Sequence, residues 1–234
     1  MKAIWTLIAY IFFSISPTPL ATPVSKIVKV NGETFTYAFF RSLPTDISLI
    51  ANFDSKTDVT SLILSNTCNS AVNGGFYDTK SQPLGYFVTK GQKIHNSIQS
   101  TLLNGYFWID EGKASITSTL PSKSTGIALQ TGPMLVENGK PRILHLSNDE
   151  HARRMIAVIE NTGNVIFLTL YNTDAVFEGP LLRTLPELVD KIALLESLGI
   201  TSAINLDGGS ASAFYSDTTK LSELTLVGSV FCIK

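Results

Sequence analysis

Near the C-terminus, an apolar run leads directly into a carboxylate that is followed by two glycines. The segment reads SAINLDGGSAS, in which Asp207 precedes Gly208, Gly209 and Ser210. Glycines permit positive φ angles and let a ligand approach the main chain closely. The same pattern is typical of a turn in which the aspartate bonds to its own backbone. A catalytic carboxylate and a simple turn are therefore both open for Asp207.

Three further segments place polar groups beside small residues at expected strand ends. They are Asn73-Gly74-Gly75-Phe76-Tyr77-Asp78, Gln130-Thr131-Gly132-Pro133 and Arg153-Arg154. Loops at strand ends are where a rigid scaffold usually presents functional groups. Together with Asp207, these segments supply carboxylates, a guanidinium group, amides, a hydroxyl and exposed backbone. This set suits an anionic, hydroxyl-rich ligand such as a sugar phosphate.

Composition and missing motifs narrow the other possibilities. The 234 residues are 44% hydrophobic and carry a net charge of −1, so a sizeable core is available and no basic face is evident. Nucleic acid is therefore not an expected partner. The sequence lacks a G-x-S-x-G elbow, an H-E-x-x-H motif, a C-x-x-C pair and a P-loop. The histidines lack metal-ligand spacing, so no metal site is assigned to them.

Most of the chain is expected to form β-strands. Asn31-Gly32 and Asn138-Gly139 each lie between short apolar stretches, a pattern typical of β-hairpins. The segment RRMIAVIENTGNVIFLTLY predicts two strongly apolar strands around a polar turn. The segment DSKTDVTSLILSNT is interpreted either as a short helix or as an irregular link.

One helix is expected immediately before the strand that leads to the Asp207 segment. Thr184 and Glu187 have the spacing of a capping box at its start. Leu188, Ile192 and Leu195 are predicted to share its buried face, with Gly199 after its end. The expected fold class is α+β, a strand-rich mixed sheet with one or two packed helices.

The first residues have the pattern of an export signal. Lys2 precedes the apolar run AIWTLIAYIFFSI, which is too short to span a bilayer comfortably. The segment SPTPLATP then suits a signal-peptidase site near Ala21, with cleavage between Ser16 and Pro23. Residues 1–21 are therefore predicted to be a signal peptide. The mature protein is expected to be periplasmic or secreted, with no stable membrane anchor after cleavage.

The two cysteines are the only thiols of the sequence. An oxidising compartment would allow Cys68 and Cys232 to pair, and a bridge would connect the last strand to the segment before NGGFYD. Spacing alone does not decide between this disulfide and two free buried thiols.

The order of four motifs resembles the phosphodiester glycosidase family. NGGFYD, ALQTGPMLVENGK, RRMIAV with NTGNVIFLTL, and LLESLGITSAINLDGGSAS follow one another as in that family. The resemblance extends from about Val30 to the C-terminus, so residues 22–234 are expected to form one phosphodiester glycosidase-like domain. It implies a hydrolase that cleaves the glycosidic bond of a sugar-1-phosphodiester, whether small or polymeric, and releases a sugar and a phosphomonoester.

The resemblance also implies particular site residues. The family's Asn-Gly-Gly-Phe-Phe-Asp run falls on Asn73 to Asp78, and its Gln-Ser-Gly-Pro run falls on Gln130 to Pro133. The arginine of the family's Arg-Thr-Ala-Ile-Gly strand is assigned to Arg154, which leaves Val158 in place of the glycine. The residues expected to bind substrate are Asn73, Gly74, Gly75, Thr131, Gly132, Asn205, Gly208, Gly209 and Ser210. At the last of these motifs the hydroxyl comes from either Ser210 or Ser212.

The expected chemistry uses carboxylates and an arginine. Asp207 is predicted to attack the anomeric carbon, activate water or stabilise the oxocarbenium-like centre, with Asp78 as the second carboxylate. Arg154 is predicted to bind the departing phosphate. No cofactor is assigned, although Asp78 and Asp207 are oxygen donors of the type that hold Ca²⁺ or Mg²⁺. The alternative function is an exported glycan-binding module without turnover.

Overall fold

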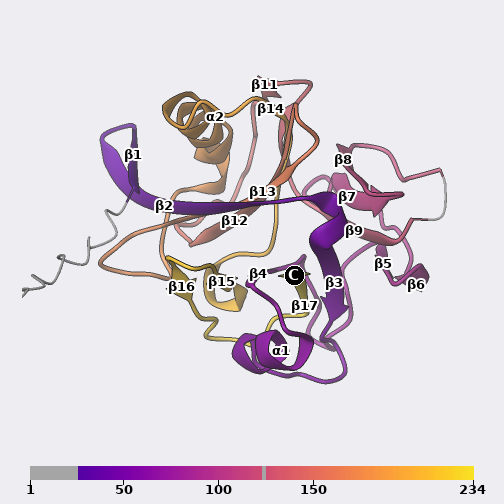
Figure 1. Cartoon of the computed structure of the whole chain (residues 1–234). Helices are drawn as coiled ribbons and strands as arrows, with labels where there is room; N and C mark the ends of the chain where they lie inside the picture. The colour runs from indigo at the N-terminus through magenta and orange to yellow at the C-terminus, as the bar shows by residue number, and fades with distance from the viewer. Residues whose placement is uncertain (1–25, 123–124) are drawn as a thin grey trace, which may run out of the picture.

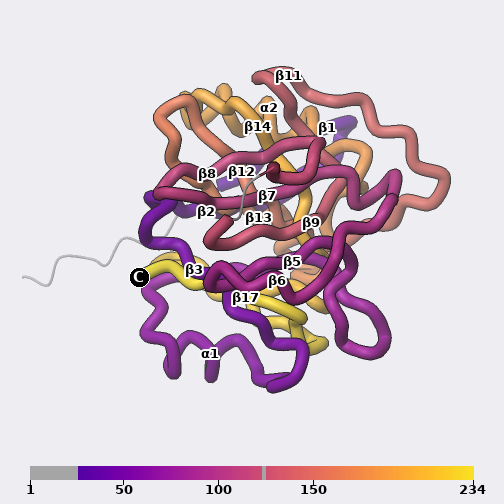
Figure 2. The backbone as a smooth tube through the Cα atoms, turned by 90° about the vertical axis from the view of Figure 1, so that its right-hand side faces the viewer, coloured from indigo at the N-terminus to yellow at the C-terminus, as the bar shows by residue number. Residues whose placement is uncertain are grey.

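The computed structural model describes residues 26–122 and 125–234. The expected signal peptide and its cleavage site lie outside the described residues. The described chain forms three antiparallel sheets and two α-helices, α1 (Val59–Asn66) and α2 (Leu185–Leu195), which lie at opposite ends of the molecule (Figures 1 and 2). The α+β class is confirmed. Within these residues, neither helix is long and apolar enough to cross a membrane.

The three sheets draw their strands from distant parts of the chain. The seven-stranded sheet has the order β1 (Lys26–Val30), β2 (Glu33–Ser42), β13 (Val165–Tyr171), β12 (Arg154–Glu160), β14 (Ile200–Asn205), β10 (Met134–Glu137) and β11 (Lys140–Pro141). One five-stranded sheet has the order β16 (Lys220–Leu221), β15 (Phe214–Tyr215), β4 (Ser70–Asn73), β17 (Ser229–Ile233) and β3 (Ile47–Ala51). The other has the order β6 (Gln92–His95), β5 (Phe87–Thr89), β9 (Ile127–Thr131), β7 (Gly105–Asp110) and β8 (Lys113–Thr117). Three short 3₁₀ turns complete the described elements: η1 (Pro44–Asp46), η2 (Leu182–Thr184) and η3 (Gly209–Ala211).

The predicted hairpins are confirmed. Asn31 and Gly32 have φ angles of 49° and 84° and join β1 to β2, as a two-residue turn with positive φ at both positions requires. Asn138 and Gly139 join β10 to β11 in the same way. The two apolar strands expected around the polar turn are β12 and β13.

Strand β12 is buried on both faces, which explains its continuous apolar sequence. Met155 and Ala157 point into the core between the sheets, whereas Ile156 and Val158 point toward α2. This alternation follows from the two-residue period of a strand. Consecutive side chains at its beginning therefore face opposite sides of the sheet, and this decides which of two arginines can reach the loop after β14.

Helix α2 forms as expected but begins and ends differently from the prediction. Thr184 has helical backbone angles and its hydroxyl donates to the Leu181 carbonyl, so the capping box is not made. Glu187 instead pairs with Lys191 one turn later. The predicted buried face is correct for Leu188 and Ile192 but wrong for Leu195, which is 62% exposed because the helix ends there.

The ambiguous segment before the first cysteine is helical. Asp58 caps α1 by accepting a hydrogen bond from the Ser61 amide at 2.9 Å. Thr67 then ends the helix in the left-handed conformation, and Cys68 follows. Cys68 and Cys232 form a disulfide, which joins the end of α1 to β17. Of the two alternatives left open by the sequence, the structure contains the pairing.

Candidate active site

The loop after β14 is held against the end of β4 at Asp207. The Asp207 amide donates to the Gly74 carbonyl at 3.1 Å, and the Asn73 side-chain amide donates to the Asp207 carbonyl at 2.9 Å. The Asn73 side-chain oxygen accepts from the Ala213 amide at 2.9 Å. Asn73 is 1% exposed, and these two hydrogen bonds of its side chain hold Asp207 and Ala213, which lie at the two ends of the loop. Two motifs whose bonded residues are 134 positions apart in sequence therefore form one structural unit.

The two positions after Asp207 require glycine for different structural reasons. A Cβ atom at Gly208 would lie 2.6 Å from the Arg153 carbonyl oxygen, so no side chain fits at that position. Gly209 has a φ of +62° and its amide donates to the same carbonyl at 2.8 Å. A left-handed conformation is accessible to glycine at little cost. The pair therefore lets the loop turn tightly over the start of β12.

The Asp207 carboxylate is half-buried and has few partners. Its Oδ1 atom accepts from the Gly208 amide at 2.8 Å, and no donor among the described residues contacts Oδ2. Burial raises the pKa of Asp207 to about 7, and the Gly208 donor opposes this increase. The charge of Asp207 in turn helps to raise the pKa of the Tyr77 phenol, after burial. A carboxyl group with a pKa near neutrality is suited to proton transfer or nucleophilic attack.

Arg153 lies directly beneath the Asp207 loop and is completely buried. Its Nε atom donates to the Ser212 hydroxyl at 2.8 Å, and its Nη2 atom donates to the Ser212 and Ser222 carbonyls. The guanidinium group also stacks over the Phe177 ring, 4.5 Å from its centroid. Burial lowers the pKa of Arg153 to about 10, so the group stays protonated at neutral pH.

Arg154 does not occupy the position expected from the resemblance. Its guanidinium group donates to the Pro180 and Glu150 carbonyls and lies 3.6 Å from an Asp149 carboxylate oxygen. Arg154 is the first residue of β12, so its side chain points to the same face of the sheet as that of Ile156. This face packs against α2 and points away from the Asp207 loop. The sequence-based assignment is therefore corrected: Arg153, not Arg154, supports this loop.

The motif itself held a signal for this correction. If the family's Arg-Thr-Ala-Ile-Gly run starts at Arg153, its final glycine falls on Ala157 rather than Val158. Alanine is the smallest replacement for glycine, so this register fits the family pattern better than the one that starts at Arg154. Strand alternation alone does not show which register is right, because both arginines are buried.

Residues of the third motif support the loop from a second direction. The Thr131 hydroxyl donates to the Asn205 carbonyl at 2.9 Å, and the Asn205 side-chain amide donates to the Gly132 carbonyl at 2.9 Å. Thr131 and Asn205 are 0% and 2% exposed. Together with Asn73, they lie in the protein interior, where their side chains bond the backbone of the segments that form the site. Gly75 packs against Leu129, where a Cβ atom would come within 2.8 Å of a methyl group.

The second predicted carboxylate holds a turn. Asp78 Oδ1 accepts from the Lys80 and Gln82 amides, both at 2.8 Å. This arrangement is an Asx turn, and it explains the aspartate without catalysis. Ser210 is exposed, and its hydroxyl accepts from Thr225 at 2.7 Å, so it remains at the surface of the loop. Across the described residues, no group of three or more His, Cys, Asp or Glu side chains could hold a metal ion.

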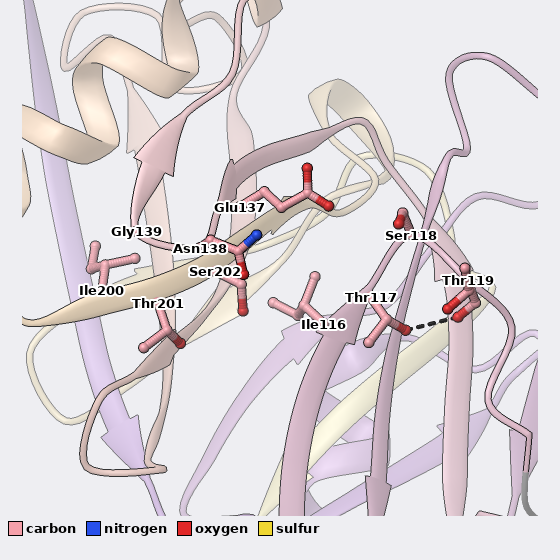
Figure 3. Close-up of a pocket in the computed structure, with 10 residues that line it drawn as sticks. All are labelled: Ile116, Thr117, Ser118, Thr119, Glu137, Asn138, Gly139, Ile200, Thr201 and Ser202. Atoms are coloured by element: carbon pink, nitrogen blue, oxygen red, sulfur yellow. Dashed lines mark hydrogen bonds between the residues drawn. The ribbon is translucent and has the colours of Figure 1, made fainter.

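One pocket lies elsewhere and does not contain Asp207. It has a volume of about 540 Å³ and lies where the β10–β11 turn and the start of β14 approach β8 (Figure 3). Figure 3 shows Glu137, Thr201 and Ser202 on one side of it and Thr117 on the other. Asp207 follows Ser202 by five positions, roughly 17 Å along an extended chain. We therefore do not assign the chemistry of Asp207 to this pocket.

The chain belongs to the phosphodiester glycosidase family. The family model matches residues 66–233, which include β4, the Asp207 loop and both arginines. The Escherichia coli K12 protein YigE, which is uncharacterised, is 36% identical over 152 residues. That match covers 60% of this chain and 53% of YigE, so the chain spans about half the length of this relative.

Solved structures share the fold at low sequence identity. The catalytic domain of zebrafish N-acetylglucosamine-1-phosphodiester alpha-N-acetylglucosaminidase, auto-inhibited by its pro-peptide, superposes with a TM-score of 0.70 at 16% identity, covering 89% of this chain and 81% of that one. A Burkholderia pseudomallei protein thought to be exported gives a TM-score of 0.61 at 11% identity, covering 86% and 74%. A hypothetical protein from Synechocystis gives 0.58 at 14% identity, covering 89% and 61%. These likenesses establish the fold, and the family membership supports a glycosidase-type enzyme.

Proposed function

We propose that this chain is an exported hydrolase that cleaves the glycosidic bond of a sugar-1-phosphodiester and releases the sugar and a phosphomonoester. The observation that carries this proposal is the Asp207 carboxylate. It is half-buried, it is fixed through its backbone by Asn73 and Gly74, and it has one oxygen free of described donors. Membership of the phosphodiester glycosidase family supplies the substrate class.

In the proposed reaction, Asp207 acts in its ionised form on the anomeric side of the bond. The bond between the anomeric carbon and the phosphate oxygen breaks, and the phosphate keeps the electron pair. A new bond forms from the anomeric carbon to a water oxygen, either directly or after attack by Asp207, and the water proton is released. Both routes require a charged carboxylate. Because the pKa of Asp207 is raised to about 7, we expect the rate of diester cleavage to rise with pH through the neutral range.

One carboxylate is sufficient for this substrate class because the leaving group is a good one. A phosphomonoester has a second pKa of about 6, so its departure needs little help from a general acid. This agrees with the Asx-turn position of Asp78, which leaves that carboxylate to hold the backbone. The buried charge of Arg153 lies under the loop and favours negative charge on the phosphate above it. Arg153 is therefore a positioning residue, because it is too buried to touch substrate.

Export is proposed from the N-terminal sequence. Lys2, the short apolar run and the small residues before Thr22 form the pattern of a cleaved signal peptide. A structural relative from Burkholderia pseudomallei that is thought to be exported is consistent with this. Sugar phosphodiesters of the cell surface would then be within reach of the mature enzyme.

The deciding experiment is a panel of sugar-1-phosphodiesters, scored for free sugar and for phosphomonoester. The wild-type protein is expected to release both in equal amounts. Asp207→Asn is expected to lower kcat by at least about 100-fold. Asp78→Asn, which keeps the acceptor of the Asx turn, is the matched control and should stay within about threefold of wild type. If no diester is cleaved while glycans still bind, the function is that of a binding module instead.

A further inference from the structure

A small, mostly apolar pocket lies beside Tyr77, a residue of the motif that holds the Asp207 loop. Its volume is about 230 Å³, and it is shaped mainly by Phe53, Tyr77, Leu226 and Val227. Gly228 forms its floor, because a Cβ atom there would come within 2.7 Å of Phe53 and 2.9 Å of Tyr77. The absence of a side chain at Gly228 therefore keeps both aromatic rings at the edge of the pocket.

The wall between this pocket and Asp207 is built from shared residues. The Tyr77 hydroxyl donates to the Leu226 carbonyl at 2.7 Å. The Ser210 carbonyl accepts from the Leu224 and Thr225 amides at 2.8 and 3.0 Å. Residues 224–226 therefore connect Tyr77 to the Asp207 loop. Only this short stretch of chain therefore separates the pocket lining from the Asp207 loop.

The lining of the pocket indicates what it would take. Its free surface is mostly apolar, and Leu226 remains 43% exposed at the rim. Asn52, Ser81 and Thr225 also line it, but the Asn52 amide already bonds the Val227 carbonyl and the Thr57 amide, and the Thr225 hydroxyl already donates to Ser210. Lys56 also lines it and is exposed, so a cation stands at the edge of an apolar hollow. A sugar ring would leave its hydroxyls without partners against such a surface. An alkyl or aryl group attached to a phosphate fits both the apolar lining and the cation.

We propose that this pocket is the aglycone subsite, and that the preferred substrate is a sugar-1-phosphodiester whose second alcohol is apolar. The inference rests on the proposed function, because it names the group on the far side of the phosphate. In this arrangement the sugar lies at Asp207, the phosphate crosses the wall formed by Tyr77 and Leu226, and the apolar group enters the pocket. The volume equals that of roughly eight water molecules, which suits a phenyl ring or a short alkyl chain.

The test compares two synthetic substrates that share one sugar. The octyl and methyl diesters of N-acetylglucosamine-1-phosphate are assayed with the full mature protein. We expect kcat/KM for the octyl diester to exceed that for the methyl diester by at least about tenfold. Burial of a few additional methylene groups in the pocket is enough to produce a tenfold difference. Leu226→Gln should remove most of this preference, so that kcat/KM for the octyl diester falls toward the value for the methyl diester.

Leu224→Gln is the matched control. Leu224 is in the same loop and is 73% exposed, but it does not line the pocket, so this variant should keep the full octyl preference. Cleavage of both diesters at equal efficiency overturns the subsite and leaves the proposed function standing. If neither diester is cleaved, the proposed function fails, and calorimetry with octyl phosphate and methyl phosphate decides about the pocket. Tighter binding of octyl phosphate that is lost in Leu226→Gln supports the pocket, and equal binding refutes it.

Discussion

The raised pKa of Asp207 makes a prediction about stability that is independent of any substrate. Replacing Asp207 with Asn keeps an oxygen that can accept from the Gly208 amide, but it removes the charge. In the folded protein the carboxyl group holds its proton up to about pH 7, whereas the unfolded chain releases it near the ordinary aspartate pKa of 3.8. Between these two pH values the folded state binds more protons, so wild-type stability falls as the pH rises. The Asn variant does not have this decrease.

The size of the effect follows from the pKa difference. A shift of about three units corresponds to about 4 kcal/mol of unfolding free energy, if the carboxylate is fully shielded from water. Because Asp207 is half-buried, solvent reduces this to about 2 kcal/mol. We therefore expect Asp207→Asn to be more stable than wild type by about 2 kcal/mol at pH 8. For a chain of this size this corresponds to a Tm increase of about 4–8 °C.

The assay is denaturant or thermal unfolding of both proteins at pH 4.5 and pH 8. The stabilisation by Asp207→Asn should be small at pH 4.5 and reach its full value above pH 7. Asp78→Asn serves as the control, because it removes one negative charge from an Asx turn and keeps the acceptor there. Equal differences at the two pH values, or a less stable Asp207→Asn protein at pH 8, would refute the claim that Asp207 is destabilised by burial of its charge.

Three further predictions concern the supports of the site and the ends of the chain. Arg153→Lys should lower kcat by at least about tenfold, because the contacts to Ser212 and Ser222 need the planar guanidinium group. Arg154→Lys should lower Tm but leave kcat per folded molecule nearly unchanged. Equal kcat values for the two variants would contradict the assignment of Arg153 as the supporting arginine. Reduction of the Cys68–Cys232 disulfide, which closes a loop of 164 residues, should lower the unfolding free energy by about 3–5 kcal/mol, and unreduced protein should show no alkylatable thiol by mass spectrometry. N-terminal sequencing of exported protein should find a start near Thr22, and an intact N-terminus in exported protein would disprove cleavage.

Local chemistry in the sequence was enough to predict many elements. Hairpin turns such as Asn31-Gly32 follow from the positive φ angles that Asn and Gly tolerate, and these turns are found where expected. The end of α2 was harder to predict, because Leu195 fits the helical period but lies past the point where packing covers the helix. Periodicity shows which residues can share a face, but not where the neighbouring sheet stops.

The sequence by itself determined the family, the α+β class and Asp207 as the candidate carboxylate, because these depend on motifs and their order along the chain. The tertiary structure decided which side chains support the loop that carries this carboxylate. It buried Asn73 under the loop and placed Arg153 instead of Arg154 beneath it. The physical reason is that neighbouring residues at the start of a strand point to opposite faces, and only the packing of the sheets determines which face meets the loop.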